Sequence, residues 1–164
     1  MSQPWPWRYP YQEDGPRLDT IVLRPIVPVT LVGTAGLSSS AFALVDSGCS
    51  HILVSQGLAR SVQLHFRDSQ RQLRLGIGGT TVEVRFLDAT LRLHPDQAGD
   101  DEFFEWRTEV GVIREWRPTF QVVLGQLGFM DHFTVTMSRH AQETAVEAVT
   151  EYDKRFPVRY GGVR

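Results

Sequence analysis

Short apolar segments alternate with polar residues along most of the chain, and their spacing is that of β-strands. Residues 20–33 ("TIVLRPIVPVTLVG") and 41–46 ("AFALVD") are two such segments, and "TAGLSSS" between them is rich in turn-forming residues. The order predicts a hairpin whose second strand leads into Asp46.

Further strands are predicted downstream of this hairpin. Residues 71–95 alternate around a glycine-rich tip at residues 76–79, which predicts a long hairpin and a following strand. Residues 103–113 and 120–125 predict two more strands, the second fully apolar and ended by a glycine. After them, residues 126–133 fit one or two helical turns.

Two segments are ambiguous. In residues 51–64 a helical spacing of leucine and valine is interrupted by Gly57, so a short strand and turn are predicted there. Residues 143–152 ("ETAVEAVTEY") fit helix and strand equally, and both alternatives stay open. Because strand signals dominate elsewhere, the expected fold class is all-β with one short helix.

The ends of the chain differ from its middle. Residues 1–19 are rich in proline, tryptophan and tyrosine, which predicts an extended arm whose aromatic side chains cap the rest of the fold; binding of a proline-rich peptide is the alternative. We therefore expect an arm over 1–19, one domain over 20–150 and a tail over 151–164.

Composition excludes several classes of function. The chain has 164 residues, 41% of them hydrophobic, and a net charge of -2, which is typical of a globular protein without affinity for nucleic acid or membrane. The N-terminus has no secretory pattern, so we expect a cytoplasmic protein. The single cysteine, Cys49, and five histidines without ligand spacing predict no disulfide, no metal and no cofactor.

The Asp-Ser-Gly turn at residues 46–48 carries the candidate chemistry. By itself such a tripeptide is typical of a plain turn, in which Asp and Ser bond their own backbone. Here apolar residues flank it on both sides, at residues 41–45 and 52–54. A carboxylate carried towards the interior is unfavourable unless it is paired or neutralised, so the pattern predicts a partner for Asp46 or a function.

Three stretches, in order, resemble the retropepsin-like aspartic proteases. "VPVTLVG" with "FALVDSGCS" is similar to that family's paired strands and D-[ST]-G catalytic turn, "LRLGIGGTTVEV" to its glycine-rich flap, and "FQVVLGQLGFMDHF" to the strand and helix that support the turn. The resemblance covers roughly residues 25–136. It implies a closed acid-protease barrel with a flap hairpin.

The resemblance also implies the site and the reaction. Asp46, Ser47 and Gly48 would be catalytic, and the expected substrate-binding residues are Ser50, Gly76, Ile77, Gly78 and Gly79. Two carboxylates that share one proton would activate a water to hydrolyse a peptide bond, and apolar peptide segments are the expected substrate. Such a pair shares a proton because two like charges about 3 Å apart cannot both ionise.

The sequence contains D-[ST]-G once, because Asp68-Ser69 is followed by Gln70 and Asp14-Gly15 lacks the hydroxyl residue. The second carboxylate would therefore come from a second copy, which predicts a homodimer with one Asp46 from each subunit.

Two other functions compete with this prediction. Cys49 beside Ser50 and His51 invites a thiol-protease interpretation, although neighbours this close along the chain are poorly placed as nucleophile and base. The stronger alternative is a retropepsin-like dimerisation or peptide-binding module with weak or no catalysis.

Overall fold

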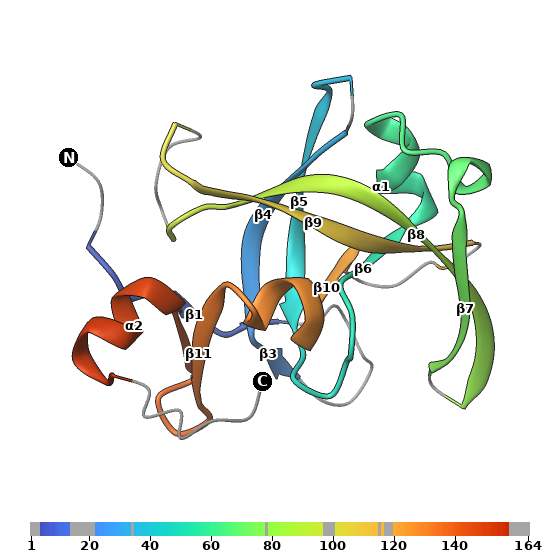
Figure 1. The fold of residues 1–164 in the computed structure, drawn as a ribbon. Coiled ribbons are helices and arrows are strands. Elements are labelled where there is room, and N and C mark those ends of the chain that lie inside the picture. Colours follow the sequence, from blue (N-terminus) through green and yellow to red (C-terminus); the bar gives the residue numbers. More distant parts are fainter. Residues whose placement is uncertain are drawn as a thin grey trace.

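β-strands dominate the structure, a computed structural model that describes residues 4–13, 22–33, 35–77, 79–96, 101–114, 116 and 120–157 (Figure 1). Seven strands of this described part form one sheet in the order β4-β5-β10-β6-β9-β8-β7, and β8 also pairs with β4. These strands are β4 (Ile26–Val32), β5 (Ser38–Val45), β6 (Leu53–Ser55), β7 (Arg71–Ile77), β8 (Thr80–Leu93), β9 (Phe104–Ile113) and β10 (Val122–Leu124).

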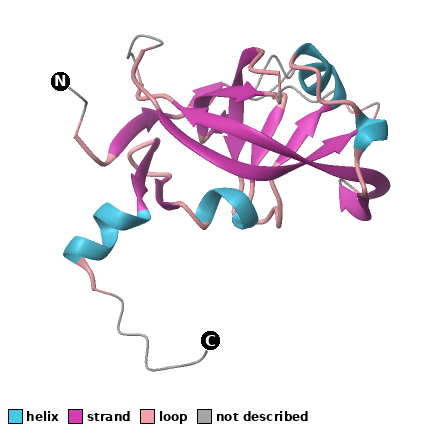
Figure 2. Cartoon of the chain, turned by 45° about the horizontal axis from the view of Figure 1, so that its top comes forward, coloured by secondary structure: helices cyan, strands magenta, loops and turns pink. Residues whose placement is uncertain are grey.

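Two smaller sheets and a few helices complete the described fold. The order of one sheet is β1-β12-β11, and β2 pairs with β3 in the other. The strands are β1 (Trp7–Pro10), β2 (Gln12–Glu13), β3 (Leu23–Arg24), β11 (Phe133–Ser138) and β12 (Glu143–Ala148). The helical elements are α1 (Gln56–Ser61), α2 (Val149–Arg155), the 3-10 turn η1 (Phe66–Asp68) and the irregular helical turn η2 (Gln126–Met130). Figure 2 shows how small the helical part is beside the long strands.

The all-β prediction is confirmed, but the prediction of one short helix is wrong. Helix α1 forms in residues where a turn was expected: Ser55 caps it by accepting a hydrogen bond from the Leu58 N–H at 3.3 Å. Leu58 and Ala59 of this helix are buried, and their burial outweighs the low helix propensity of Gly57.

Both alternatives for residues 143–152 hold in part. The segment begins as strand β12, which pairs with β1 and β11, and from Val149 it continues as helix α2. The strand gives way to the helix where its pairing with β11 ends, since Ala148 is the last β12 residue in register, opposite Phe133.

The hydrophobic core lies between the strands, and side chains of the N-terminal strand β1 belong to it. Trp7 and Tyr9 are buried there with residues of β4, β8 and β9. The Tyr9 hydroxyl donates to the carbonyl of His94 at 2.8 Å, and the His94 ring lies 2.9 Å from the Thr30 hydroxyl. The described part of the N-terminal segment is thus held on the core, and residues 14–19 of the expected arm lie outside the described residues.

No helix in the described ranges has the length and apolar character needed to cross a bilayer. The expected boundaries at residues 19 and 150 stay a prediction.

Candidate functional site

Asp46 stands at the end of a buried pair of parallel strands. β5 and β10 run side by side, with Leu124 in register with Val45. The Asp46 N–H donates to the Leu124 carbonyl at 3.0 Å, which extends the ladder by one residue. Val45 and Leu124 are buried while Asp46 is half-buried, so the chain leaves the core at the carboxylate.

The turn itself fixes one oxygen of this carboxylate. The Cys49 N–H donates to the Asp46 carbonyl at 3.1 Å and closes the turn. The Gly48 N–H donates to Asp46 Oδ1 at 2.9 Å. A Cβ at Gly48 would lie 3.2 Å from the same oxygen, so a larger residue would crowd it. Asp46 therefore forms the local turn that its residue type predicts, with its carboxylate oriented by a backbone donor.

A second segment holds the turn from behind. The N–H groups of Gln126 and Leu127 donate to the carbonyls of Cys49 and Ser50, both at 2.9 Å. Gly125 lies so close that a Cβ would be 2.3 Å from the His51 carbonyl oxygen. The glycine that ends the apolar strand of residues 120–125 thus allows the backbone of residues 125–127 to approach that of residues 49–51 closely.

The cysteine in this loop is not arranged as a nucleophile. The Cys49 thiol donates to the His51 carbonyl at 3.1 Å, while the His51 ring lies 2.8 Å from the Ser50 hydroxyl. Burial raises the pKa of the Cys49 thiol, the hydrogen bond to His51 lowers it and the charge of Asp46 raises it further. A thiol whose pKa is raised and which donates to a backbone carbonyl does not fit the thiol-protease alternative.

His51 links the turn to the base of the β7–β8 hairpin. The centre of its ring lies 4.9 Å from the centre of the Phe86 ring. The Arg71 guanidinium lies over the Phe86 ring as well, 4.6 Å from its centre. Arg71 also forms an ion pair with Glu109. Burial lowers the pKa of His51, as does the charge of Arg71, while Glu109 raises it.

The predicted glycine-rich hairpin is present, with β7 and β8 paired from Arg71↔Phe86 to Ile77↔Thr80. Gly76 lies near its tip and is exposed, and Gly79 takes a positive φ of 81°, a conformation that favours glycine. Gly78 and the side chain of Ile77 lie outside what the structure describes. In Figure 1 the tip and the turn after β5 both project to the lower side of the sheet.

The structure therefore groups the predicted site residues in two places. Asp46, Ser47, Gly48 and Ser50 form one loop, and the hairpin tip forms another; no hydrogen bond joins the two among the described residues. Sequence reasoning missed the contact of Gln126, whose side-chain Nε2 donates to the Ser47 carbonyl at 2.8 Å. No pattern in the sequence pointed to it.

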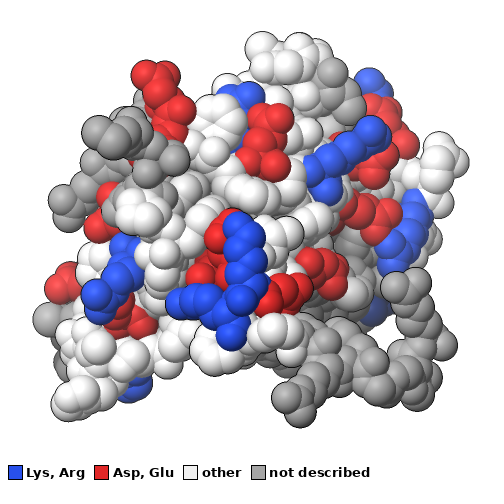
Figure 3. Space-filling view, turned by 60° about the vertical axis from the view of Figure 1, so that its left-hand side comes forward, with Lys and Arg blue, Asp and Glu red and all other residues white. Residues whose placement is uncertain are grey.

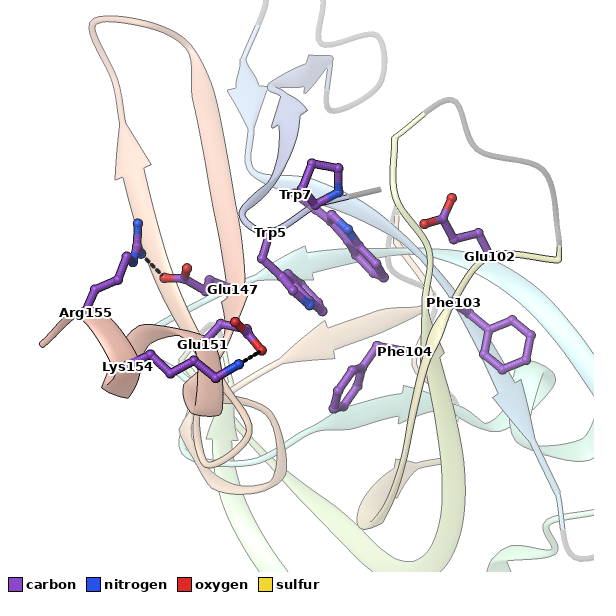
Figure 4. A pocket seen from close by; sticks show the side chains of 10 residues that line it. Trp5, Trp7, Glu102, Phe103, Phe104, Glu147, Glu151, Lys154 and Arg155 are labelled. Atoms are coloured by element: carbon purple, nitrogen blue, oxygen red, sulfur yellow. Dashed lines mark hydrogen bonds and ion pairs between the residues drawn. The ribbon is translucent and has the colours of Figure 1, made fainter. Parts of the chain in front are cut away.

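A pocket of about 570 Å³ lies elsewhere, between the N-terminal residues, the start of β9 and α2 (Figure 4). Trp5 stacks on Trp7 at its wall, with 4.0 Å between ring centroids. Among the lining side chains, Glu147 pairs with Arg155 and Glu151 with Lys154. Figure 3 shows basic and acidic side chains side by side on the face that it draws, rather than a patch of one sign. None of the lining residues belongs to the Asp46 loop, so we do not place the chemistry here.

Within the described ranges, no three His, Cys, Asp or Glu side chains are grouped so that they could hold a metal ion.

Comparison with known proteins gives matches in structure alone. No family model and no curated protein matches the chain. The structure is similar to the retroviral protease-like domain of Ddi1 from Leishmania major, with 14% identity and a TM-score of 0.44 over 70% of this chain and 82% of that one. It is also similar to EIAV protease complexed with the inhibitor HBY-793, with 15% identity, a TM-score of 0.34 and coverage of 68% and 88%. A retropepsin-like aspartic protease from Rickettsia conorii matches with 8% identity, a TM-score of 0.41 and coverage of 74% and 90%. The three matches are thus to proteases and protease-like domains of the kind that the sequence resembles, and because their TM-scores are below 0.5 they carry no argument about this chain.

Proposed function

We propose that this chain is an aspartic-type endopeptidase that works as a homodimer, with one Asp46 from each subunit in a shared site. The observation that carries the proposal is the Asp46 carboxylate, half-buried at the end of the β5–β10 pair and oriented by the Gly48 N–H at 2.9 Å. A carboxylate positioned by the backbone, yet open on one side, suits acid-base work.

The dimer follows from the number of carboxylates that the reaction needs. The sequence supplies one D-[ST]-G turn, so a two-fold axis beside it would bring in the second aspartate. Leu127, which is bonded to the loop through the Ser50 carbonyl, is 53% exposed in the isolated chain. A partner subunit would cover this apolar side chain, and a stable interface of this kind buries on the order of 1,000 Å².

The mechanism uses the two carboxylates in different protonation states. One, ionised, takes a proton from a water as the water oxygen attacks the scissile carbonyl carbon; the other, protonated, donates to the carbonyl oxygen. Collapse of the resulting diol breaks the C–N bond: the carboxyl that took the water's proton donates it to the amine that leaves, and the other carboxylate takes a proton from a diol hydroxyl. The pair ends with one proton, as it began.

The β7–β8 hairpin is proposed as the flap over the substrate. Residues 80–83 pair with β7 alone, because β9 joins the ladder only from Val84 onward. A two-stranded segment without a third strand is marginally stable and can move. We propose that it closes on an apolar peptide through Gly76, Ile77, Gly78 and Gly79, while Ser50 contacts the substrate from the loop.

The remaining parts of the proposal concern the barrel and the location. The pairing of β8 with β4, which returns to the first strand of the sheet order, supports a closed barrel of the retropepsin-like kind. A cytoplasmic location is proposed with it, and cell fractionation would test that point.

Asp46→Asn tests the function. Asparagine keeps the size and one acceptor oxygen but can neither take a proton from water nor hold the shared one, so cleavage of a peptide library should be lost. Asp68→Asn is the matched control, because Asp68 also precedes a serine but is exposed and lies in η1.

The two outcomes separate the candidate functions. Loss of cleavage in the first variant, with full cleavage in the second, supports the endopeptidase. A purified wild-type dimer that cleaves nothing across acid and neutral pH favours the alternative, a retropepsin-like module for dimerisation or peptide binding.

A further inference from the structure

The side chain of Gln126 lies across the catalytic turn. It begins η2, directly after the buried Gly125, and is itself exposed. Its Nε2 donates to the Ser47 carbonyl at 2.8 Å, and its backbone N–H donates to the Cys49 carbonyl at 2.9 Å. The glutamine is therefore fixed at both ends to the same loop.

The accepting carbonyl belongs to a peptide group that also holds the carboxylate. The Ser47 C=O and the Gly48 N–H are the two polar ends of one planar peptide unit. That N–H donates to Asp46 Oδ1 at 2.9 Å. The Gln126 amide, the peptide and the carboxylate thus form one chain of hydrogen bonds, in which a bond to the carbonyl oxygen strengthens the N–H as a donor.

We propose that Gln126 is a positioning residue for the Asp46 carboxylate, acting through the Ser47–Gly48 peptide group. The inference rests on the proposed aspartic-protease function, which makes Asp46 the reacting group. By holding the plane of this peptide, Gln126 keeps Oδ1 occupied and fixes the direction of the other carboxylate oxygen. Loss of Gln126 should therefore slow the chemical step, because Gln126 orients the reacting Asp46 carboxylate through this peptide.

The chemistry of position 126 can be varied with little change in size. Gln126→Met keeps the length of the side chain and removes the donor. Gln126→Glu keeps the shape, but an ionised carboxylate cannot donate and would face the Ser47 carbonyl; once protonated, below its ordinary pKa of about 4.3, its O–H can donate again. Gln121→Met, at an exposed glutamine just before β10, is the matched control.

The test measures kcat and KM for one peptide substrate of the wild-type dimer between about pH 3.5 and 6.5. Loss of one hydrogen bond of ordinary strength should lower kcat about tenfold in Gln126→Met at every pH, with KM within about twofold. In Gln126→Glu, kcat should be lowered by the same factor near pH 6 and should return towards the wild-type value near pH 3.5, each relative to wild type at the same pH. Gln121→Met should match wild type.

An amide NMR spectrum tests the hydrogen-bond chain without any activity. The Gly48 amide proton should move upfield in Gln126→Met and stay in place in Gln121→Met. If the wild type cleaves nothing, the proposed function fails, and this resonance alone decides whether Gln126 acts on the peptide that holds Asp46.

Three results would overturn the inference. They are an unmoved Gly48 resonance in Gln126→Met, unchanged kcat in an active enzyme, or a Gln126→Glu variant whose loss is the same at both pH values.

Discussion

Replacement of Gly125 by alanine should destabilise the protein and displace the loop that carries Asp46. The new Cβ would lie 2.3 Å from the His51 carbonyl oxygen and 2.6 Å from that of Cys49. Ordinary contacts begin at 3.4 Å, so the two segments must separate by about 1 Å. The backbone at Gly125 has φ -97°, which alanine adopts without strain, and the effect is therefore one of space.

The size of the effect follows from what must move. Both nearest atoms are backbone atoms of a loop that is bonded to η2, so rotation of a side chain cannot relieve the contact. Overpacking of this kind costs about 3 kcal/mol. In a chain of this size that lowers Tm by roughly 6 to 12 °C. Because the displaced loop carries Asp46, proteolysis should fall as well.

The assay is thermal unfolding followed by circular dichroism at one fixed protein concentration, since the Tm of the proposed dimer would depend on concentration. Gly57→Ala is the control: it adds the same methyl group in α1, with no atom within 4 Å, and should raise stability by about 0.5 to 1 kcal/mol. A Gly125→Ala protein that melts with the wild type would refute the close approach of the two segments.

Three further outcomes are expected. Tyr9→Phe removes the hydrogen bond to the His94 carbonyl and should lower the free energy of unfolding by about 1 to 2 kcal/mol, measured by urea denaturation; equal stability would show the bond to be dispensable. Arg71→Gln should raise the pKa of His51 towards about 6.5, followed by NMR, because it removes a positive charge that disfavours the imidazolium. In the wild type the lowered pKa means that stability is present above about pH 6.5 and declines as the pH falls through the folded-state pKa, and the variant should show a smaller decline. Leu127→Glu should weaken the dimer at least tenfold in sedimentation equilibrium, and an unchanged dissociation constant would place Leu127 outside the interface.

The strands could be predicted because their signals are local. Alternation in residues 80–93 and the apolar run before Gly125 determine which side chains are buried, and turn residues mark where the strands end. The Asp46 turn was found for the same reason, since its sequence and flanking residues lie next to each other in the chain.

Other features depend on contacts that local sequence does not encode. Helix α1 forms although Gly57 lies inside it, because Ser55 caps its start and the sheet buries Leu58. Gln126 reaches Ser47 across 79 positions of sequence, so no spacing rule could connect them. The dependence of such contacts on the three-dimensional fold explains why the turn was predicted and the side chain that holds it was missed.

Mixed dimers test the central claim, that two Asp46 carboxylates from different chains form one site. A wild-type chain and an Asp46→Asn chain carrying different affinity tags would be co-expressed, and the dimer retaining both tags purified and assayed at once, before its subunits exchange. We predict that it cleaves less than about one hundredth as fast as the wild-type dimer, since a single carboxylate cannot act as both acid and base. A mixed dimer with about half the wild-type rate would show that each chain has a complete site of its own, and would contradict the shared carboxylate pair.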